Sequence, residues 1–233
     1  MTRSQWKIVV PCILLTVLTI CWVLFGGRSP QKPTVHLRDA NKVKTAIANF
    51  AAKKTDKIDL STLRFESEDF ALVGNVSSVP KLFLGNSTIK DADMELVAKL
   101  PNLKELDLTR TRITDKGILF LKDHQTLENL YLSQTQISDK GLETIATIPN
   151  LKHLILWRCN ITDAGCMSLA KTENLVSLSL DETMISDRGV RQLLPLKNLK
   201  ELKIIGTRVT DAGINAAKRN WSGIVLNQEF MNK

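Results

Sequence analysis

The sequence predicts an α/β array of stacked repeats, with a parallel sheet on one face and helices on the other. Leucines recur at a fixed interval of 24 residues, at Leu103, Leu127, Leu151, Leu175 and Leu199. The phrase I-(T/S)-D-x-G, or its variant with valine, follows each of them. Residues 79–102 fit the same template with Asp93 in place of the glycine, which makes six copies. A constant period of this length indicates a repeat architecture, because one such unit cannot bury its apolar face alone.

Each copy predicts a short strand, then a turn and a helix. Leu106 and Leu108 alternate with polar residues in the period of two that a strand with one buried face requires. Further along the repeat, Leu142, Ile145 and Ile148 show the apolar spacing of a helix.

A helix N-cap is predicted at the T/S-D pair of each phrase. Either the Thr or Ser, or the aspartate that follows it, can accept the first backbone N–H groups of the helix. The pairs are Thr114-Asp115, Ser138-Asp139, Thr162-Asp163, Ser186-Asp187 and Thr210-Asp211. The glycine two residues after each aspartate permits either a positive φ or close backbone packing. We interpret the aspartates as scaffold, since one carboxylate per turn does not make a calcium cage.

A column of small polar residues lies just behind the predicted strands, at Ser87, Thr111, Thr135, Cys159, Thr183 and Thr207. We expect these side chains to satisfy backbone groups of the turns from copy to copy. Cys159 and Cys166 are predicted to be buried free thiols, with a local disulfide or a redox role as alternatives. No cysteine or histidine spacing is typical of a zinc site, so no metal or cofactor is expected.

The repeated line L-x-x-L-x-L-x-x-(T/S/C)-x-I-(T/S)-D-x-G resembles the leucine-rich repeat family, in its variant of about 24 residues per repeat. The resemblance covers residues 79–226. It implies a right-handed solenoid, or horseshoe, with a parallel sheet on the concave face and helices on the convex face. It also implies a protein that holds another macromolecule on the concave face.

The chain divides, on this interpretation, into a short basic tail (1–7), a transmembrane helix (8–25), a tether (26–34), an N-terminal cap (35–78), six repeats (79–222) and a C-terminal cap strand and tail (223–233). A helix is predicted over residues 39–53, with Val43, Ala46, Ile47, Phe50 and Ala51 on one stripe. Phe70–Gly74 is predicted as an edge strand, and Trp221–Asn227 as a truncated last strand with Ile224 and Leu226 facing inward.

Residues 8–25 contain no charged side chain and would span about 27 Å as a helix, enough to cross a bilayer core. A cleaved signal peptide and a lipoprotein signal at Cys21 are alternatives, which the missing small residues at the processing positions disfavour. Arg3 and Lys7 precede the span, although more basic residues follow it. We expect a single-pass protein with its repeats on the non-cytoplasmic side.

Charge and motifs exclude several functions. The formal net charge is +8, but Arg3, Lys7, Arg28 and Lys32 account for half of it, and the remaining +4 is too small to indicate nucleic acid binding. The sequence holds no nucleophile elbow, phosphate-binding loop or dinucleotide fingerprint. We therefore expect a non-enzymatic protein that binds a protein partner, with an envelope or cell-wall glycan-binding structural protein as the alternative.

The candidate binding residues are read from the outward positions of the strands. Tyr131, Ile155 and Trp157 stand out there, because a strand face turned only to water should be mostly polar. His153, Asp107, Arg110 and Arg158 surround or flank them and complete the predicted patch. Aromatic and arginine side chains commonly anchor protein interfaces. The alternative is that these side chains pack against a flanking loop or are isolated surface apolar residues.

Overall fold

The computed structural model describes residues 39–76 and 78–227. The basic tail, the predicted span of residues 8–25 and the tether lie outside the described residues. No helix within the described ranges is long and apolar enough to cross a membrane.

Within the described residues, the strands form one parallel eight-stranded sheet in chain order. They are β1 (Ile58–Asp59), β2 (Lys81–Phe83), β3 (Glu105–Asp107), β4 (Asn129–Tyr131), β5 (His153–Ile155), β6 (Ser177–Ser179), β7 (Glu201–Lys203) and β8 (Val225–Asn227). Register partners are one full repeat apart throughout, as in Leu106↔Leu130 and Leu130↔Leu154. The predicted period is therefore the register of the sheet.

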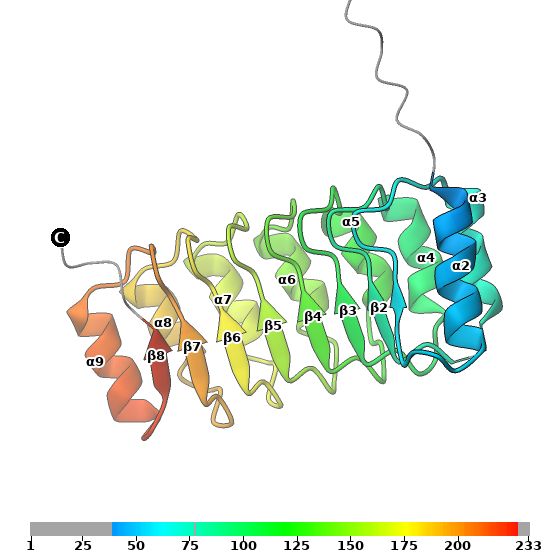
Figure 1. Cartoon of the computed structure of the whole chain (residues 1–233). Coiled ribbons are helices and arrows are strands. Elements are labelled where there is room, and N and C mark those ends of the chain that lie inside the picture. The colour runs from blue at the N-terminus through cyan, green and yellow to red at the C-terminus, as the bar shows by residue number, and fades with distance from the viewer. Residues whose placement is uncertain (1–38, 77, 228–233) are drawn as a thin grey trace, which may run out of the picture. The chain divides into compact units, whose positions relative to one another are not determined.

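Most of the helices lie behind the sheet, and the first of them stands at the blue end of the array (Figure 1). They are α2 (Ala40–Ala51), α3 (Ser67–Phe70), α4 (Met94–Ala98), α5 (Asp115–Ile118), α6 (Asp139–Ile145), α7 (Asp163–Leu169), α8 (Asp187–Leu193) and α9 (Asp211–Asn220). Short 3-10 turns occur at Ala71–Asn75, Asp91–Asp93 and Leu119–Leu121. Sheet and helices together form an α/β solenoid.

One continuous core runs between the two layers. The leucines at the centre of the strands, such as Leu106, Leu130 and Leu154, are completely buried. At the first end of the array, α2 buries Val43 and packs Phe50 against the core, whereas Ala51 is exposed, contrary to the predicted stripe. At the other end, the predicted last strand forms over Val225–Asn227 only, with Leu226 in register with Leu202, while Trp221 is the C-cap of α9.

The prediction of an edge strand at Phe70–Gly74 is wrong. Phe70 ends α3, and the residues after it form a 3-10 turn. The edge strand is β1, which pairs with β2 through Ile58↔Leu82. The residues from β1 to this turn form a degenerate copy of the repeat, in which Phe70 is a fully buried helix residue at the position that Met94 occupies one repeat later.

Thr and Ser, not the aspartates, are the N-caps of helices α5 to α9. Each side-chain oxygen accepts a hydrogen bond from the backbone N–H two residues later, as Thr162 does from Ala164. Each such cap contributes about 1 kcal/mol. The aspartates, which open the helices, are therefore available for a different contact.

Among the described residues, each of these aspartates except Asp211 joins its repeat to the next, and Asp91 does the same in the first repeat. Asp139 Oδ1 accepts the backbone N–H of Thr162 at 2.8 Å, and Asp139 Oδ2 accepts the Thr162 hydroxyl at 2.5 Å. We call the series of such pairs the aspartate ladder. Its pairs are Asp91–Thr114, Asp115–Ser138, Asp139–Thr162, Asp163–Ser186 and Asp187–Thr210.

Hydrogen bonds favour the charged form of two ladder carboxylates, Asp163 and Asp187. Burial alone would raise the pKa of Asp163, but the hydroxyl and N–H of Ser186 and the N–H of Gly189 outweigh burial and lower this pKa from 3.8. A carboxylate whose pKa is lowered on folding stabilises the fold above its unfolded pKa and loses that effect as the pH falls through the folded value.

The glycine within each of the later repeats has a steric cause. Neither Gly141 nor Gly189 has a positive φ. A Cβ atom on Gly189 would lie 2.6 Å from Asp163 Oδ1, and one on Gly141 would lie 2.9 Å from Ile137 Cγ2 and closer still to an Asp115 oxygen. Close packing, rather than positive φ, therefore requires glycine, because the ladder carboxylate of the previous repeat fills the space of a side chain.

The degenerate copy and the first repeat place a carboxylate at the start of the helix in a different way. Ser67 stands at the ladder position that Asp91 holds one repeat later. Asp69 and Asp93 occupy the glycine position, where their carboxylates accept the N–H groups of Glu66 at 3.2 Å and of Lys90 at 2.9 Å. The N–H at the start of the helix is thus bonded to a carboxylate in both arrangements.

The small polar column satisfies backbone groups, as predicted: Thr111 and Thr135 donate their hydroxyls to the carbonyls of Leu108 and Leu132 in their own repeats. Between copies, the Thr135 hydroxyl lies 3.6 Å from the Cys159 thiol of the next repeat. The Cys159 thiol also reaches the preceding repeat at the Leu132 carbonyl. Cys159 and Cys166 are both buried and free, and burial raises the pKa of the Cys166 thiol to about 12.

Replacing Asp139 by alanine tests the ladder. The change leaves the Thr162 N–H and hydroxyl without their carboxylate partner, so the free energy of unfolding should fall by about 1–3 kcal/mol in a denaturant titration. Asp211→Ala is the matched control: Asp211 opens α9 in the same way, but within the described residues its carboxylate bonds no following repeat. That variant should change stability by at most about 1 kcal/mol, through the helix dipole. Equal losses for both variants would contradict a stabilising ladder.

Candidate partner-binding face

The strands present three columns of outward side chains, which we call the sheet face. The first column holds the first residue of each strand from β2 to β7: Lys81, Glu105, Asn129, His153, Ser177 and Glu201. The second column holds the last residue of each of these strands: Phe83, Asp107, Tyr131, Ile155, Ser179 and Lys203. The third column lies two residues after each strand and holds Gly85, Thr109, Ser133, Trp157, Asp181 and Ile205. The leucines between them point into the core. The ladder and the strand register fix these columns, so side chains at equivalent positions of successive repeats are neighbours.

Three predicted residues are brought together at the middle of the face. Asp107, Tyr131 and Ile155 are successive register partners on β3, β4 and β5, which lie side by side in Figure 1. The Tyr131 hydroxyl donates to Glu105 Oε1 at 3.3 Å. His153 lies on β5 in register with Asn129, two residues before Ile155.

Trp157 and Arg158 form a second cluster with Glu182, which the sequence analysis did not single out. The Arg158 guanidinium lies 4.8 Å from the Trp157 ring centroid. Glu182 accepts the Trp157 indole N–H at 3.1 Å and the Arg158 Nε–H at 2.5 Å. The Arg158 guanidinium and then the Trp157 indole lower the pKa of the Glu182 carboxyl from 4.5. The sequence did hold a signal for this ion pair: Glu182 stands one repeat after Arg158, so opposite charges follow each other in one column.

Arg110 does not join this cluster. Its Nε–H donates to Gln134 Oε1 at 2.7 Å, while Arg158 pairs with Glu182. All four residues share a left-handed backbone conformation with φ between 52° and 57°. This conformation is uncommon for residues other than glycine and asparagine, so the sequence carried no signal for it.

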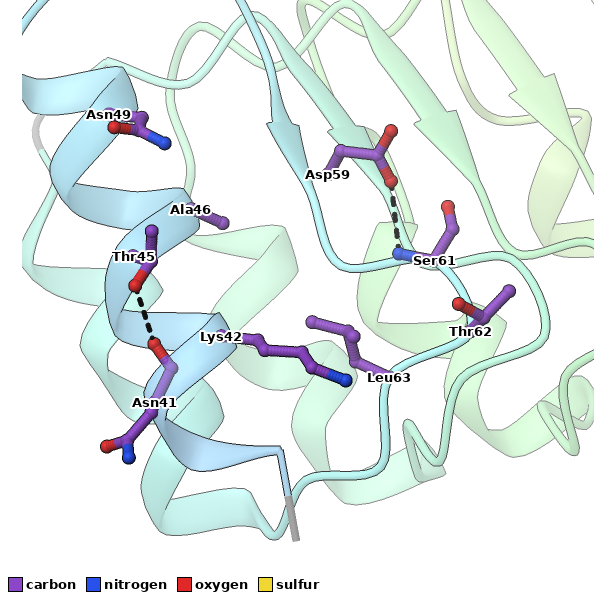
Figure 2. A pocket seen from close by; sticks show the side chains of 9 residues that line it. All are labelled: Asn41, Lys42, Thr45, Ala46, Asn49, Asp59, Ser61, Thr62 and Leu63. Carbon is purple, nitrogen blue, oxygen red and sulfur yellow. Dashed lines mark hydrogen bonds between the residues drawn. The ribbon is translucent and has the colours of Figure 1, made fainter.

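A groove lies apart from the predicted patch, between α2 and the loop that follows β1 (Figure 2). Its volume is about 630 Å³, and its lining residues are Asn41, Lys42, Thr45, Ala46, Asn49, Asp59, Ser61, Thr62 and Leu63. Part of that lining is already engaged, since Asp59 Oδ1 accepts the N–H of Ser61 and Lys42 pairs with Asp39. In the part of the chain that the structure describes, no three His, Cys, Asp or Glu side chains are grouped to hold a metal ion.

Tyr131 reports directly on the electrostatics of the face, because it is the only tyrosine of the chain. Burial, followed by the negative charge of Glu105, raises the pKa of its phenol above 10.0. Ultraviolet titration of the folded protein should therefore give a midpoint above 10.0 for the wild type. The midpoint should fall in Glu105→Gln, which removes the nearby charge. A wild-type midpoint at or below 10.0, measured while the fold is intact, would contradict the described environment.

Comparison with known proteins agrees with the repeat architecture. Residues 99–122, 123–146 and 147–170 each match a family model described as a leucine-rich repeat. No curated protein sequence matches the chain.

Solved structures with a similar fold include internalins of Listeria monocytogenes. Internalin C2 is 21% identical, with a TM-score of 0.58 over 81% of this chain and 91% of that one. A second internalin is 19% identical, with a TM-score of 0.53 over 76% of this chain and 54% of that one. A leucine-rich repeat protein of Leptospira interrogans is 16% identical, with a TM-score of 0.51 over 66% of this chain and 38% of that one. This chain thus spans about half or less of the last two proteins.

At these identities the likeness concerns the fold alone. Independently of it, the three matching segments show leucine-rich repeats over residues 99–170, and the register of the sheet keeps the same spacing between neighbouring strands.

Proposed function

We propose that this chain is a non-enzymatic interaction module that binds a protein partner on the sheet face, which the family resemblance makes the concave face. The observation that carries the proposal is the group of Tyr131, Ile155 and Trp157 at the outward positions of β4 and β5 and of the turn that follows. Tyrosine, tryptophan and arginine are the residues most often responsible for binding energy in protein interfaces.

The Trp157 cluster is suited to such a role because it is held in place before any partner arrives. Arg158 stacks on the ring and Glu182 bonds both side chains. Side chains that are already ordered lose less conformational entropy on binding, so more of their contact energy is available as affinity. The partners of Trp157 lie in the turns after β5 and β6, not in a loop folded over the sheet, and the tryptophan remains partly exposed.

The parallel sheet itself favours recognition of a macromolecule rather than of a small molecule. Register-paired strands present Asp107, Tyr131 and Ile155 in one row across three repeats. Adjacent strands lie about 4.8 Å apart, so the row and its neighbours form an extended surface rather than an enclosed pocket. Partners of this kind bury broad areas around a few anchors.

We also propose that residues 8–25 tether the module to a membrane, with the repeats on the non-cytoplasmic side. The support is the uncharged segment itself and its preceding Arg3 and Lys7. The full chain should remain in the membrane pellet after an alkaline wash, whereas a chain without residues 1–33 should be soluble and folded. A full chain released by the wash, or a truncated chain retained in the pellet, would contradict the tether.

The binding proposal is tested with a partner recovered on the full chain from detergent-solubilised membranes. Trp157→Ala should weaken the affinity of the recovered protein at least about tenfold, since an interface anchor is removed. The midpoint of unfolding should change little, because Trp157 lies outside the core. Met167→Ala is the control: Met167 is 57% exposed on α7, on the helix side of the array, and its loss should not affect affinity.

Unaltered affinity after replacing both Tyr131 and Trp157 would exclude the sheet face as the binding surface. Retention of the chain by cell-wall glycan, with no protein recovered in stoichiometric amount, would contradict a protein partner and support the glycan-binding alternative.

A further inference from the structure

On the sheet face, one lysine of the protein itself, Lys57, is held by an aromatic ring and a carboxylate. The Lys57 Nζ lies 4.7 Å from the centroid of the Phe83 ring and 3.3 Å from Asp59 Oδ2. Asp59 and Phe83 are register partners on β1 and β2. A carboxylate and an aromatic ring on neighbouring strands, in one column of this face, thus hold a lysine side chain. The carboxylate attracts its charge, and the ring makes a cation–π contact.

The same pair of groups recurs in that column without a cation. Asp107 on β3 and Tyr131 on β4 are register partners, as Asp59 and Phe83 are. Asp107 Oδ1 accepts the N–H of Thr109 at 2.8 Å, but no hydrogen bond or salt bridge among the described residues engages Asp107 Oδ2. That oxygen is a carboxylate acceptor with unused capacity.

The Asp107 carboxylate approaches the backbone after β2 closely because Gly85 has no side chain. A Cβ atom built on Gly85 would lie 3.2 Å from Asp107 Oδ2, so any larger residue would crowd it. The equivalent positions of the later repeats hold Thr109, Ser133 and Trp157. Gly85 therefore lets the Asp107 carboxylate lie where a side chain like those of the later repeats would crowd it.

The surroundings add negative charge. Glu105, two residues before Asp107 on the same strand, forms no salt bridge among the described residues and accepts only the Tyr131 hydroxyl, at 3.3 Å. The cation in register with it, Lys81, pairs with Asp56 at 2.8 Å, and Lys57 pairs with Asp59. The negative charge of Glu105 still attracts Lys81 electrostatically, but neither the Glu105 nor the Asp107 carboxylate forms a salt bridge among the described residues.

We propose that Phe83, Gly85, Glu105, Asp107 and Tyr131 form a cation slot that binds a lysine side chain of the protein partner. The ammonium group lies against the Tyr131 ring and pairs with the Asp107 and Glu105 carboxylates, as Lys57 does with Phe83 and Asp59. This inference rests on the proposed sheet-face function and adds to it the chemistry of the partner: a segment with an exposed lysine, seated next to the apolar and aromatic anchors of β5.

Tyr131 makes the slot directly observable, because the full chain with labelled tyrosine gives ring NMR signals from one residue only. The probe is the peptide acetyl-Ala-Lys-Ala-amide, used at millimolar concentration, since one exposed side chain binds weakly. Its control replaces lysine with norleucine, which keeps most of the apolar stem and lacks the charge. The lysine peptide should shift the Tyr131 signals saturably, and high salt should abolish the shift. The norleucine peptide should give no shift.

Asp107→Asn should weaken binding of the lysine peptide at least about tenfold, because it removes the carboxylate charge and keeps the shape. Asp123→Asn is the matched control, as it removes the same charge from the turn before β4, away from the sheet face. Asparagine also tolerates the positive φ of 56° at that position. Equal shifts with lysine and norleucine, or equal weakening by the two variants, would overturn the cation slot.

Different experimental results would contradict the cation slot and the proposed function. If the lysine peptide leaves Tyr131 unshifted while Trp157→Ala still weakens partner binding, the cation slot is wrong and the interaction face stands. If the peptide shifts Tyr131 in the wild type and less in Asp107→Asn, while Trp157→Ala has no effect on the partner, the slot is supported and the anchor assignment is wrong.

Discussion

The carboxylate that reaches from one repeat to the helix start of the next is the interaction on which the rest of the structure depends. In the pair Asp139–Thr162 it accepts both a backbone N–H and a hydroxyl, while the same hydroxyl oxygen caps the helix. Repeat contacts made by leucines alone would resist separation but would tolerate sliding, since the hydrophobic effect is not directional. A two-point hydrogen bond is directional, so it fixes how each repeat sits on its neighbour. The alignment of the outward side chains follows from it together with the backbone hydrogen bonds between neighbouring strands.

The same constraint explains why two different residues occupy the position two places after the ladder aspartate. Gly141 is small because Asp115 fills the space that its side chain would need. Asp93 occupies the same position in the first repeat. The copy before that repeat has Ser67 at the ladder site and so supplies no ladder aspartate. The Asp93 carboxylate instead accepts the Lys90 N–H within its own repeat. What is preserved is a carboxylate at the N–H that starts the helix, because a buried N–H without a partner is costly. The origin of the carboxylate can change.

The sequence allowed the period, the strand positions and the terminal β8 to be predicted, because burial alternates locally and the offset between repeats is constant. It did not allow Phe70–Gly74 to be recognised as helical, since a short apolar run does not distinguish a strand from a buried helix. It did not reveal either that the aspartate carboxylates bond the next repeat, because a carboxylate at a helix start can equally well cap its own helix. For the candidate site, the row of Asp107, Tyr131 and Ile155 could be read from the offset alone. The separate partners of Arg110 and Arg158 depend on side-chain reach, which spacing does not specify.

Hydrogen exchange at the backbone amides of the N-cap residues tests the central role of the ladder most directly. The amides of Thr114, Ser138, Thr162 and Ser186 lie outside the helices and strands, and their described acceptors are the ladder carboxylates. If the ladder holds the repeats together, these amides should exchange as slowly as those of the central strands, with protection close to the free energy of global unfolding. Exchange of these amides at the rate of freely exposed loops, while the strand amides remain protected, would contradict the account.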